Sequence, residues 1–364
     1  MQRLCYIANI RFPTERAHGI QVAKMCEAFA KKGLEITLLV PDRKTIAEDS
    51  YAYYGVESNF KIEKIRVPET VALGKAGFLL ESVVFASRAA KRARQVADIV
   101  YTREELPLLF LKRRTLFYEA HQLRRSHFFR WLVRRAKGII AISNGLKKAI
   151  VSIGYPETRM LVVHDGYDEK QFAEHISKAE ARARLGLPPE GEIAMYIGGL
   201  EDWKGGETLC MAAAGLKLEG ISVAIIGGTV QEAAALNKKY RDVIFLGARP
   251  YRELSQNQEA ADVLVIPNSR TTKLGSVYTS PLKLFAHMAS GIPLVLSDVP
   301  TLREVVTEHE ALFFTPDDPE SLTQAIRAVL SDRAVSQRAS QAAHTVEAYT
   351  WTKRAEKICS FIAE

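Results

Sequence analysis

Short apolar runs alternate with amphipathic helical segments along this chain, and the alternation occurs twice. In the first half, the runs predicted as strands are Leu4–Ile10, Ile36–Val40, Ile62–Val67, Ile99–Tyr101, Leu116–Tyr118, Gly138–Ile142 and Leu161–His164. In the second half, they are Ile193–Ile197, Val223–Ile226, Val243–Leu246, Val263–Ile266, Leu294–Leu296 and Leu312–Phe314. Strands that alternate with helices form parallel sheets with right-handed crossovers. The sequence therefore predicts an α/β protein with two doubly wound, Rossmann-like domains that face a cleft.

The basic residues are concentrated in the first half of the chain. Residues 1–170 hold 30 Lys and Arg against 18 Asp and Glu, whereas the remainder holds 20 against 24. Such an excess favours an anionic partner, which could be a nucleic acid, an acidic lipid surface or a phosphorylated substrate. No zinc-finger, RNP-like or helix-turn-helix pattern occurs, so no nucleic-acid partner is expected.

The segment 124–137 combines arginines with Phe128, Phe129 and Trp131. This mixture fits a helix that lies weakly on an anionic membrane surface. An ordinary helix that packs its aromatic side chains on a sheet fits the segment slightly better. We keep both interpretations at this stage.

Cysteine usage and hydropathy indicate the compartment. The scattered Cys5, Cys26, Cys210 and Cys359 are typical of reduced thiols in a cytoplasmic protein. No apolar run reaches the roughly 18 residues of a membrane span. We expect a cytoplasmic protein, with peripheral association at the inner face of the membrane as a second expectation. No metal-binding motif occurs, and neither a metal nor another cofactor is expected.

The stretch Ser276–Ser297 carries the clearest signal for a binding site. Ser280 and Pro281 lead into a helix that begins near Leu282, and a buried strand follows that helix. The first N–H groups of a helix bind anions at the carboxyl edge of an α/β sheet. Lys283 adds a positive charge in the first turn. The sequence therefore predicts a phosphate site here.

Two glycine pairs follow strands in the same half of the chain. Gly198-Gly199 precedes Lys204, and Gly227-Gly228 ends the next strand. Glycine allows the backbone to approach a phosphate closely, and Lys204 could neutralise its charge. Each pair also fits a plain strand-to-helix turn.

These motifs resemble the donor-site segments of GT-B glycosyltransferases, in the large retaining family that includes bacterial mannosyl- and glucosyltransferases. The segment SPLKLFAHMASGIPLVLSDVPTLREVV follows the family pattern closely, and Gly198 to Gly205 follows its glycine–lysine motif. The resemblance implies transfer of a sugar from a nucleotide diphosphate sugar, with UDP as the expected nucleotide, to the hydroxyl of an unidentified acceptor. Retention of configuration and independence of metal are implied as well. The nucleotide sugar would be a co-substrate.

The resemblance also assigns roles to residues. Lys204 and Lys283 would hold the leaving diphosphate, and His121, after the strand Leu116–Tyr118, would contact the donor sugar. Further contacts to the nucleotide, the phosphates or the acceptor are implied for Gly19, Gly198, Gly199, Gly227, Gly228, Arg249, Leu254, Ser280, Pro281 and Leu282. The last helix of the family crosses back to the first domain. This implies an acceptor-side domain of residues 1–168 plus 350–364 and a donor domain of residues 169–349.

Three positions depart from the family pattern. Ala286 stands where the family has a ribose-binding Glu, Tyr278 stands at the place of a second Glu, and Gly199 replaces a cationic or His side chain. We expect Ala286 to face a wet cleft and His287, the next residue, to substitute for the lost contact. The departures leave an alternative open, namely a catalytically silent GT-B-like subunit that binds a nucleotide or a partner.

Overall fold

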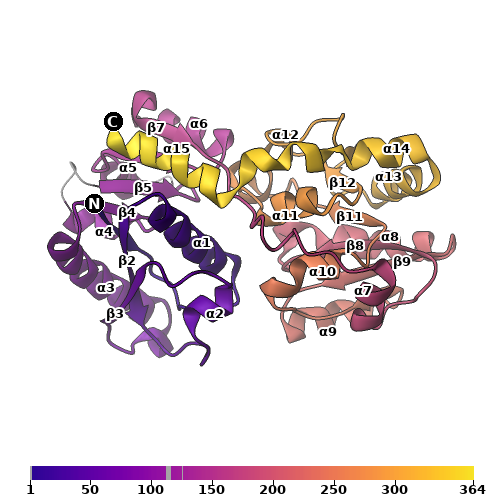
Figure 1. Ribbon diagram of the computed structural model, residues 1–364, viewed down its shortest axis with the longest axis horizontal. Helices are drawn as coiled ribbons and strands as arrows, with labels where there is room; N and C mark the ends of the chain where they lie inside the picture. Colours follow the sequence, from indigo (N-terminus) through magenta and orange to yellow (C-terminus); the bar gives the residue numbers. More distant parts are fainter. Residues whose placement is uncertain (1, 112–115, 125) are drawn as a thin grey trace. The chain divides into compact units, whose positions relative to one another are not determined.

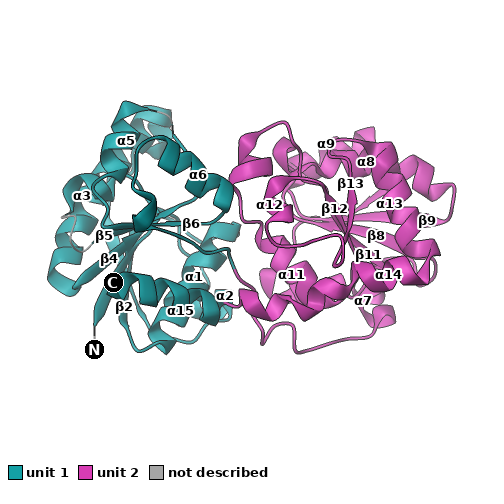
Figure 2. Ribbon diagram, turned by 90° about the horizontal axis from the view of Figure 1, so that it is seen from above, with its two compact units in different colours: residues 1–165, 351–364 teal, residues 166–350 magenta. Residues whose placement is uncertain are grey.

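The computed structural model describes residues 2–111, 116–124 and 126–364, which form two compact units (Figure 2). Unit 1 contains residues 1–165 and 351–364, and unit 2 contains residues 166–350. The chain thus leaves unit 1 three residues before the predicted boundary at 168 and returns one residue after the predicted 350. Each unit is described by itself below.

In the described residues, unit 1 is built on a seven-stranded sheet in which all paired strands are parallel. Its order is β3-β2-β1-β4-β5-β6-β7. The strands are β1 (Arg3–Ile7), β2 (Glu35–Asp42), β3 (Lys61–Arg66), β4 (Ile99–Thr102), β5 (Leu116–Ala120), β6 (Gly138–Ala141) and β7 (Met160–Val162). The order reverses beside β1, which is the hallmark of a doubly wound sheet.

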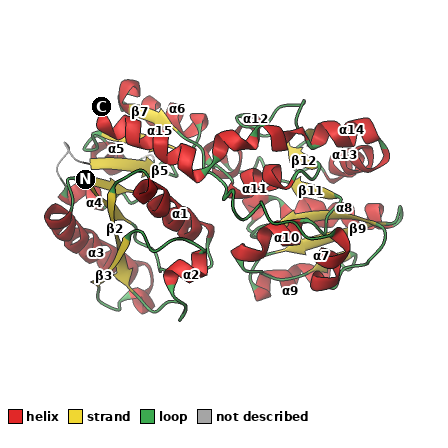
Figure 3. Cartoon of the chain, viewed as in Figure 1, coloured by secondary structure: helices red, strands yellow, loops and turns green. Residues whose placement is uncertain are grey.

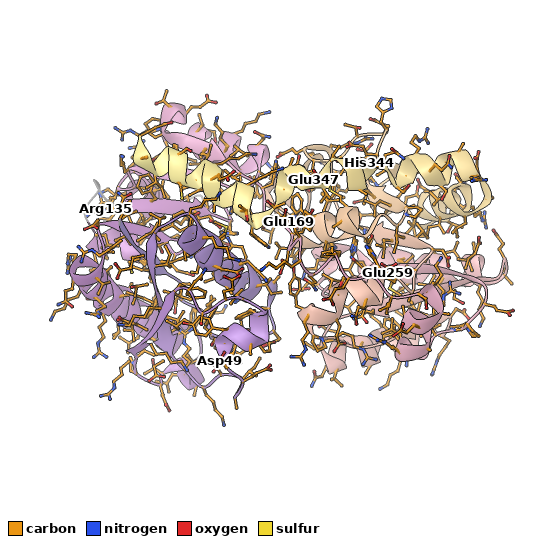
Figure 4. All side chains as sticks on the ribbon, viewed as in Figure 1. Asp49, Arg135, Glu169, Glu259, His344 and Glu347 are labelled. Carbon is orange, nitrogen blue, oxygen red and sulfur yellow. The ribbon has the colours of Figure 1, made fainter. Side chains whose placement is uncertain are left out.

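Helices cover this sheet, and the last helix of the chain is one of them (Figures 1 and 3). They are α1 (Ala17–Lys31), α2 (Ser50–Tyr54), α3 (Gly74–Val96), α4 (Pro107–Phe110), α5 (His127–Val133), α6 (Asn144–Ser152) and α15 (Trp351–Ala363). Asp49, labelled in Figure 4, caps α2 by accepting from the N–H groups of Tyr51 and Ala52. Helix α15 packs beside α1, where Glu356 pairs with Lys32.

Unit 2 repeats the architecture, with a six-stranded sheet in its described residues and the order β10-β9-β8-β11-β12-β13. The strands are β8 (Glu192–Ile197), β9 (Ile221–Ile226), β10 (Val243–Phe245), β11 (Val263–Ile266), β12 (Leu294–Ser297) and β13 (Leu312–Phe314). Its α-helices are α7 (Lys178–Leu185), α8 (Gly206–Lys217), α9 (Val230–Lys239), α10 (Leu254–Gln258), α11 (Leu282–Ser290), α12 (Pro300–Arg303), α13 (Pro319–Ser331) and α14 (Arg333–Ala339). The two sheets confirm the predicted α/β class with two Rossmann-like domains.

The strands of unit 2 are apolar throughout because both faces of the sheet are covered. Along β8, Ile193 and Met195 belong to one buried cluster, whereas Ala194 and Tyr196 belong to another. Side chains of a strand point alternately to its two faces, so the two clusters are the two layers of the core. Continuous apolar runs, without polar alternation, are what this double burial requires.

The polar stretch 169–190 is a folded part of unit 2. It contains α7, which belongs to unit 2. Arg182 of this helix is buried; its Nη2 lies 2.6 Å from Asp262 Oδ2, and its guanidinium donates to three carbonyl oxygens. A buried, fully bonded arginine explains polar sequence inside a folded unit. Among the residues described, no helix combines the length and the hydropathy that a bilayer crossing requires.

Candidate functional site

The two predicted glycine turns meet at the carboxyl edge of the unit 2 sheet. The N–H of Gly198, after β8, donates to the Ile226 carbonyl at the end of β9 over 2.9 Å. Gly227 has a φ of +126°, and a Cβ at this residue would collide with the Gly198 carbonyl. Only glycine allows this approach of two backbones. The two turns therefore lie side by side as half-buried backbone.

Lys204 ends a short 3-10 helix, Asp202–Lys204, directly after the first turn. Its Nζ lies 2.8 Å from Glu201 Oε2, and also 5.2 Å from the centre of the Trp203 ring. A Cβ at Gly199 would collide with the Glu201 carboxylate and would also meet Lys204 Nζ. The place of the family's cationic side chain is thus filled by the Glu201–Lys204 pair.

Glu201 is a site residue that the sequence analysis missed. Burial raises the pKa of its carboxyl, but the hydrogen bond from Lys204 and the charges of Lys204 and Lys283 bring the net pKa below its usual value. The residue is therefore an anion beside two lysines. A carboxylate three residues before a predicted phosphate-binding lysine was the available signal.

Lys283, in the first turn of α11, belongs to the same cluster. Its Nζ donates to Tyr196 Oη over 3.4 Å and lies 4.6 Å from the centre of the Tyr196 ring. Tyr196 Oη donates in turn to the Gly199 carbonyl over 2.6 Å. Burial, and after it the charge of Lys204, lowers the pKa of Lys283 well below its ordinary value. An anion bound between the two lysines would relieve their repulsion and restore the charge on Lys283.

The N-terminus of α11 completes this edge. Pro281 is its N-cap residue, one position earlier than the predicted first turn, and no side chain caps this end. The Leu284 N–H bonds the Pro281 carbonyl over 2.8 Å. The N–H groups of Leu282 and Lys283 have no acceptor within the helix. Ser280 and Pro281 are buried beneath them.

Arg249 and Leu254 lie after β10, on the next part of the chain. Arg249 is exposed, and Leu254, the first residue of α10, packs half-buried against the core. Among the described residues, no hydrogen bond or ion pair joins either side chain to Lys204 or Lys283. Their assignment to the nucleotide base stays a prediction.

The expectation that Ala286 faces a wet cleft is wrong. Ala286 is 2% exposed and belongs to the same core cluster as Phe285 and Met288. The five consecutive residues from Leu284 to Met288 are all buried, so α11 is enclosed nearly all round at this level. Tyr278, the other departure, ends a π-helical turn, Leu274–Tyr278, and is half-buried.

His287 does not take over the ribose contact either. Its side chain is fully buried, and its Nδ1 is hydrogen-bonded to the Gln258 amide. Burial, together with the charge of Lys283, lowers the pKa of His287 to about 3. His287 is therefore a neutral core residue, and the predicted role in nucleotide binding is corrected.

In unit 1, His121 follows β5 and lies partly exposed beside a buried carboxylate. Its Nε2 is 2.6 Å from Oε1 of Glu119, the strand residue two positions earlier. Burial, and after it the charge of Arg103, lowers the pKa of His121 to about 4 despite this carboxylate. His121 is therefore a neutral imidazole at the carboxyl edge of its sheet.

Gly19 serves packing in the described structure. It is the third residue of α1, and its N–H donates to the Arg16 carbonyl over 2.9 Å. A Cβ at this position would collide with the Tyr54 hydroxyl. The implied role of Gly19, to bring backbone N–H groups near a phosphate or the acceptor, stays a prediction.

The basic aromatic segment 124–137 has features of both predicted interpretations, a packed helix and a membrane-facing helix. Helix α5 is shorter than the predicted span, and it buries Phe129. Phe128 and Trp131 are 53% and 48% exposed and stack with ring centres 6.1 Å apart. The guanidinium of Arg135, labelled in Figure 4, lies 5.1 Å from the Trp131 ring centre. One face is therefore packed, while the other presents aromatic rings beside a cation.

Comparison with known proteins gives the family. Residues 19–171 match the family described as Glycosyltransferase Family 4, and residues 177–346 match Glycosyl transferases group 1. A D-inositol 3-phosphate glycosyltransferase of Streptomyces bingchenggensis is 28% identical over 223 residues, which are 56% of this chain and 47% of that protein. The chain thus spans about half the length of this curated relative.

Solved structures give the same fold over the whole chain. A sucrose-phosphate synthase from Thermosynechococcus elongatus superposes with a TM-score of 0.79 at 18% identity and covers 100% of this chain and 98% of that one. Anabaena HepE in complex with UDP-glucose gives a TM-score of 0.73 at 16% identity, with 100% of both chains covered. By these two family models, which match residues 19–171 and 177–346, the chain belongs to the glycosyltransferases, and the solved structures show that its fold is GT-B.

Proposed function

We propose that this protein transfers a sugar from a nucleotide diphosphate sugar, a UDP-sugar in the first instance, to a hydroxyl group of an acceptor. The reaction would retain the configuration of the sugar and would require no metal ion. The family membership supports the reaction class. UDP is favoured because the structurally similar HepE binds UDP-glucose.

The observation that carries the proposal is the cluster at the carboxyl edge of unit 2. Lys204 lies beside the glycine turn at Gly199, and Lys283, in the first turn of α11, reaches the same turn through Tyr196. A charged Lys204, a Lys283 that a bound anion would charge, and a helix N-terminus at one sheet edge suit a diphosphate. Ordered donors of this kind would stabilise the negative charge that develops on the leaving group.

In the proposed reaction, the bond between the anomeric carbon and the diphosphate oxygen breaks. The acceptor oxygen forms its bond to the same carbon on the same face of the sugar. The acceptor proton passes to an oxygen of the departing phosphate, so no side chain is needed as a covalent nucleophile. His121 of unit 1 is proposed as a hydrogen-bond partner for a hydroxyl of the sugar.

A two-stage experiment tests this function. First, thermal unfolding is measured with UDP, ADP and GDP and with their glucose and mannose conjugates; a ligand at 100 times its Kd adds about 2.7 kcal/mol of stability. Second, release of the nucleotide from the stabilising sugar donor is followed with and without EDTA. Stabilisation by none of these compounds would refute the donor site, and loss of turnover in EDTA would refute the metal-independent mechanism.

Two observations favour a second candidate, a subunit that binds a nucleotide without catalysis. Glu201 already holds Lys204, and Ala286 lies in the core instead of offering a ribose contact. Both features would weaken donor binding. A nucleotide that stabilises the protein, combined with no release from any donor, would support this second candidate over the enzyme.

A further inference from the structure

A buried ionic cluster lies directly beneath His121 in unit 1. Glu119 on β5 is fully buried, and Arg354, from the C-terminal helix α15, is 2% exposed. Arg354 Nη2 lies 3.1 Å from Glu119 Oε1, the same oxygen that contacts His121 Nε2. The guanidinium also lies 3.6 Å from Asp165 Oδ1, and its Nη1 donates to the Val163 carbonyl over 3.2 Å. The C-terminal helix thus contacts the carboxylate that is hydrogen-bonded to His121.

The contacts determine which nitrogen of His121 carries the proton. Burial alone would raise the pKa of Glu119, but the Arg354 charge, followed by the hydrogen bonds from His121 and Tyr101, holds it well below its usual range. An ionised carboxylate only accepts hydrogen bonds. Nε2 of His121 must therefore be the protonated nitrogen. Because the imidazole is neutral, Nδ1 is left as an acceptor.

Removal of Arg354 would disturb this arrangement through Glu119. The carboxylate would keep its donors Tyr101 and Gln21 but lose the only cation that contacts it among the described residues. A buried carboxylate without a cation tends to take up a proton. A protonated Glu119 could donate to Nε2, and the imidazole proton would then move to Nδ1.

We propose that Arg354 is a positioning residue that fixes His121 as the Nε2–H tautomer, so that Nδ1 accepts a hydrogen bond from a ligand hydroxyl. A neutral acceptor has no attraction for a phosphate oxygen. His121 therefore binds a hydroxyl group of its ligand. Only the assignment of that hydroxyl to a sugar rests on the proposed function. The tautomer itself does not depend on any activity.

The experiment is long-range ¹H–¹⁵N NMR of the histidine rings in the full chain at pH 7, without nucleotide or sugar. The His121 signals are identified by their loss in His121→Gln. We expect the shift pattern of the Nε2–H tautomer in the wild type. In Arg354→Gln, we expect the His121 signals to move from the Nε2–H towards the Nδ1–H shift pattern, because Glu119 without its cation takes up a proton and donates it to Nε2.

Lys357→Gln is the matched control, because Lys357 is an exposed cation one turn further along the same helix. Its His121 pattern should equal that of the wild type. An Nδ1–H pattern in the wild type, or an unchanged pattern in folded Arg354→Gln, would overturn the proposal.

A second variant covers the case in which Arg354→Gln does not fold. Arg354→Lys keeps a cation within reach of Glu119 and should fold with the Nε2–H pattern, whereas an Nδ1–H pattern in this folded variant would overturn the proposal. These spectra are recorded without nucleotide or sugar, so they do not depend on whether the protein transfers a sugar. The two ideas can therefore fail separately.

Discussion

Ala286→Glu gives the sharpest test of the burial of α11, because it restores the residue type of the family at a core position. Ala286 is 2% exposed in a packed cluster. Extra side-chain volume in a packed core costs about 1–3 kcal/mol. Glu adds the cost of a buried charge: its pKa in water is about 4.3, and buried Glu residues reach about 8–9.

The sign of the pH dependence follows from this shift. A raised pKa means that the folded variant binds more protons than the unfolded chain, so its stability falls as the pH rises above about 4.3. A shift of about three units corresponds to about 4 kcal/mol at pH 8. This is a large part of the roughly 5–15 kcal/mol that stabilises a domain.

The assay is urea unfolding followed by circular dichroism at pH 4.5 and pH 8. Ala286→Gln is the control, since it has the same shape without the charge. We expect the Glu and Gln variants to be similar at pH 4.5 and the Glu variant to be much less stable at pH 8. Equal stability at pH 8 would mean that the side chain reaches water, and the assignment of position 286 to the core would be refuted.

Three further predictions follow from the other sites. Lys204→Ala and Lys283→Ala should each raise the barrier to sugar transfer by about 2–4 kcal/mol, measured as the rate of nucleotide release. Lys217→Ala, which removes an exposed lysine, is the control and should not change this rate. Wild-type turnover in both site variants would exclude Lys204 and Lys283 from the donor site. The protein should co-sediment weakly with anionic vesicles at low salt, since each basic residue near such a surface contributes about 1 kcal/mol; Phe128→Ala with Trp131→Ala should abolish this, and equal binding would leave α5 without a role. Burial raises the pKa of Asp165 to about 7, so the folded protein keeps a proton that the unfolded chain loses, and its stability should fall as the pH rises from about 4 to 7. The urea midpoints of Asp165→Asn at pH 5 and pH 7.5 should therefore differ less than those of the wild type. An equal difference would contradict this prediction.

The alternation of strands and helices could be predicted from the sequence because each element leaves a local pattern. The apolar runs that become β8 and β11 are continuous since both faces of the sheet are covered. Glycine pairs at strand ends also leave a local signal. The contact of Gly198 with Gly227 then follows from the pairing of β8 with β9.

The positions of single side chains could not be predicted in the same way. Helical spacing indicated an apolar face on α11, but it could not show that the helix is buried on other sides as well, which places Ala286 and His287 in the core. Arg354 and Glu119 lie far apart in the sequence. Their ion pair depends on how α15 packs in unit 1, and no local pattern reports that packing.

Two of the three departures from the family pattern, Ala286 and Gly199, have different physical consequences. Ala286 stands where the family has a Glu, and it packs in the core, so the missing polar group is compensated by packing. Gly199 removes a side chain beside Lys204, and the space is filled by the Glu201 carboxylate. In the proposed function, a diphosphate would compete with Glu201 for Lys204 and would gain from restoring the charge on Lys283. Donor affinity would then depend on the balance of two lysines against one glutamate, and a substitution of Glu201 would change that balance without altering the backbone turns.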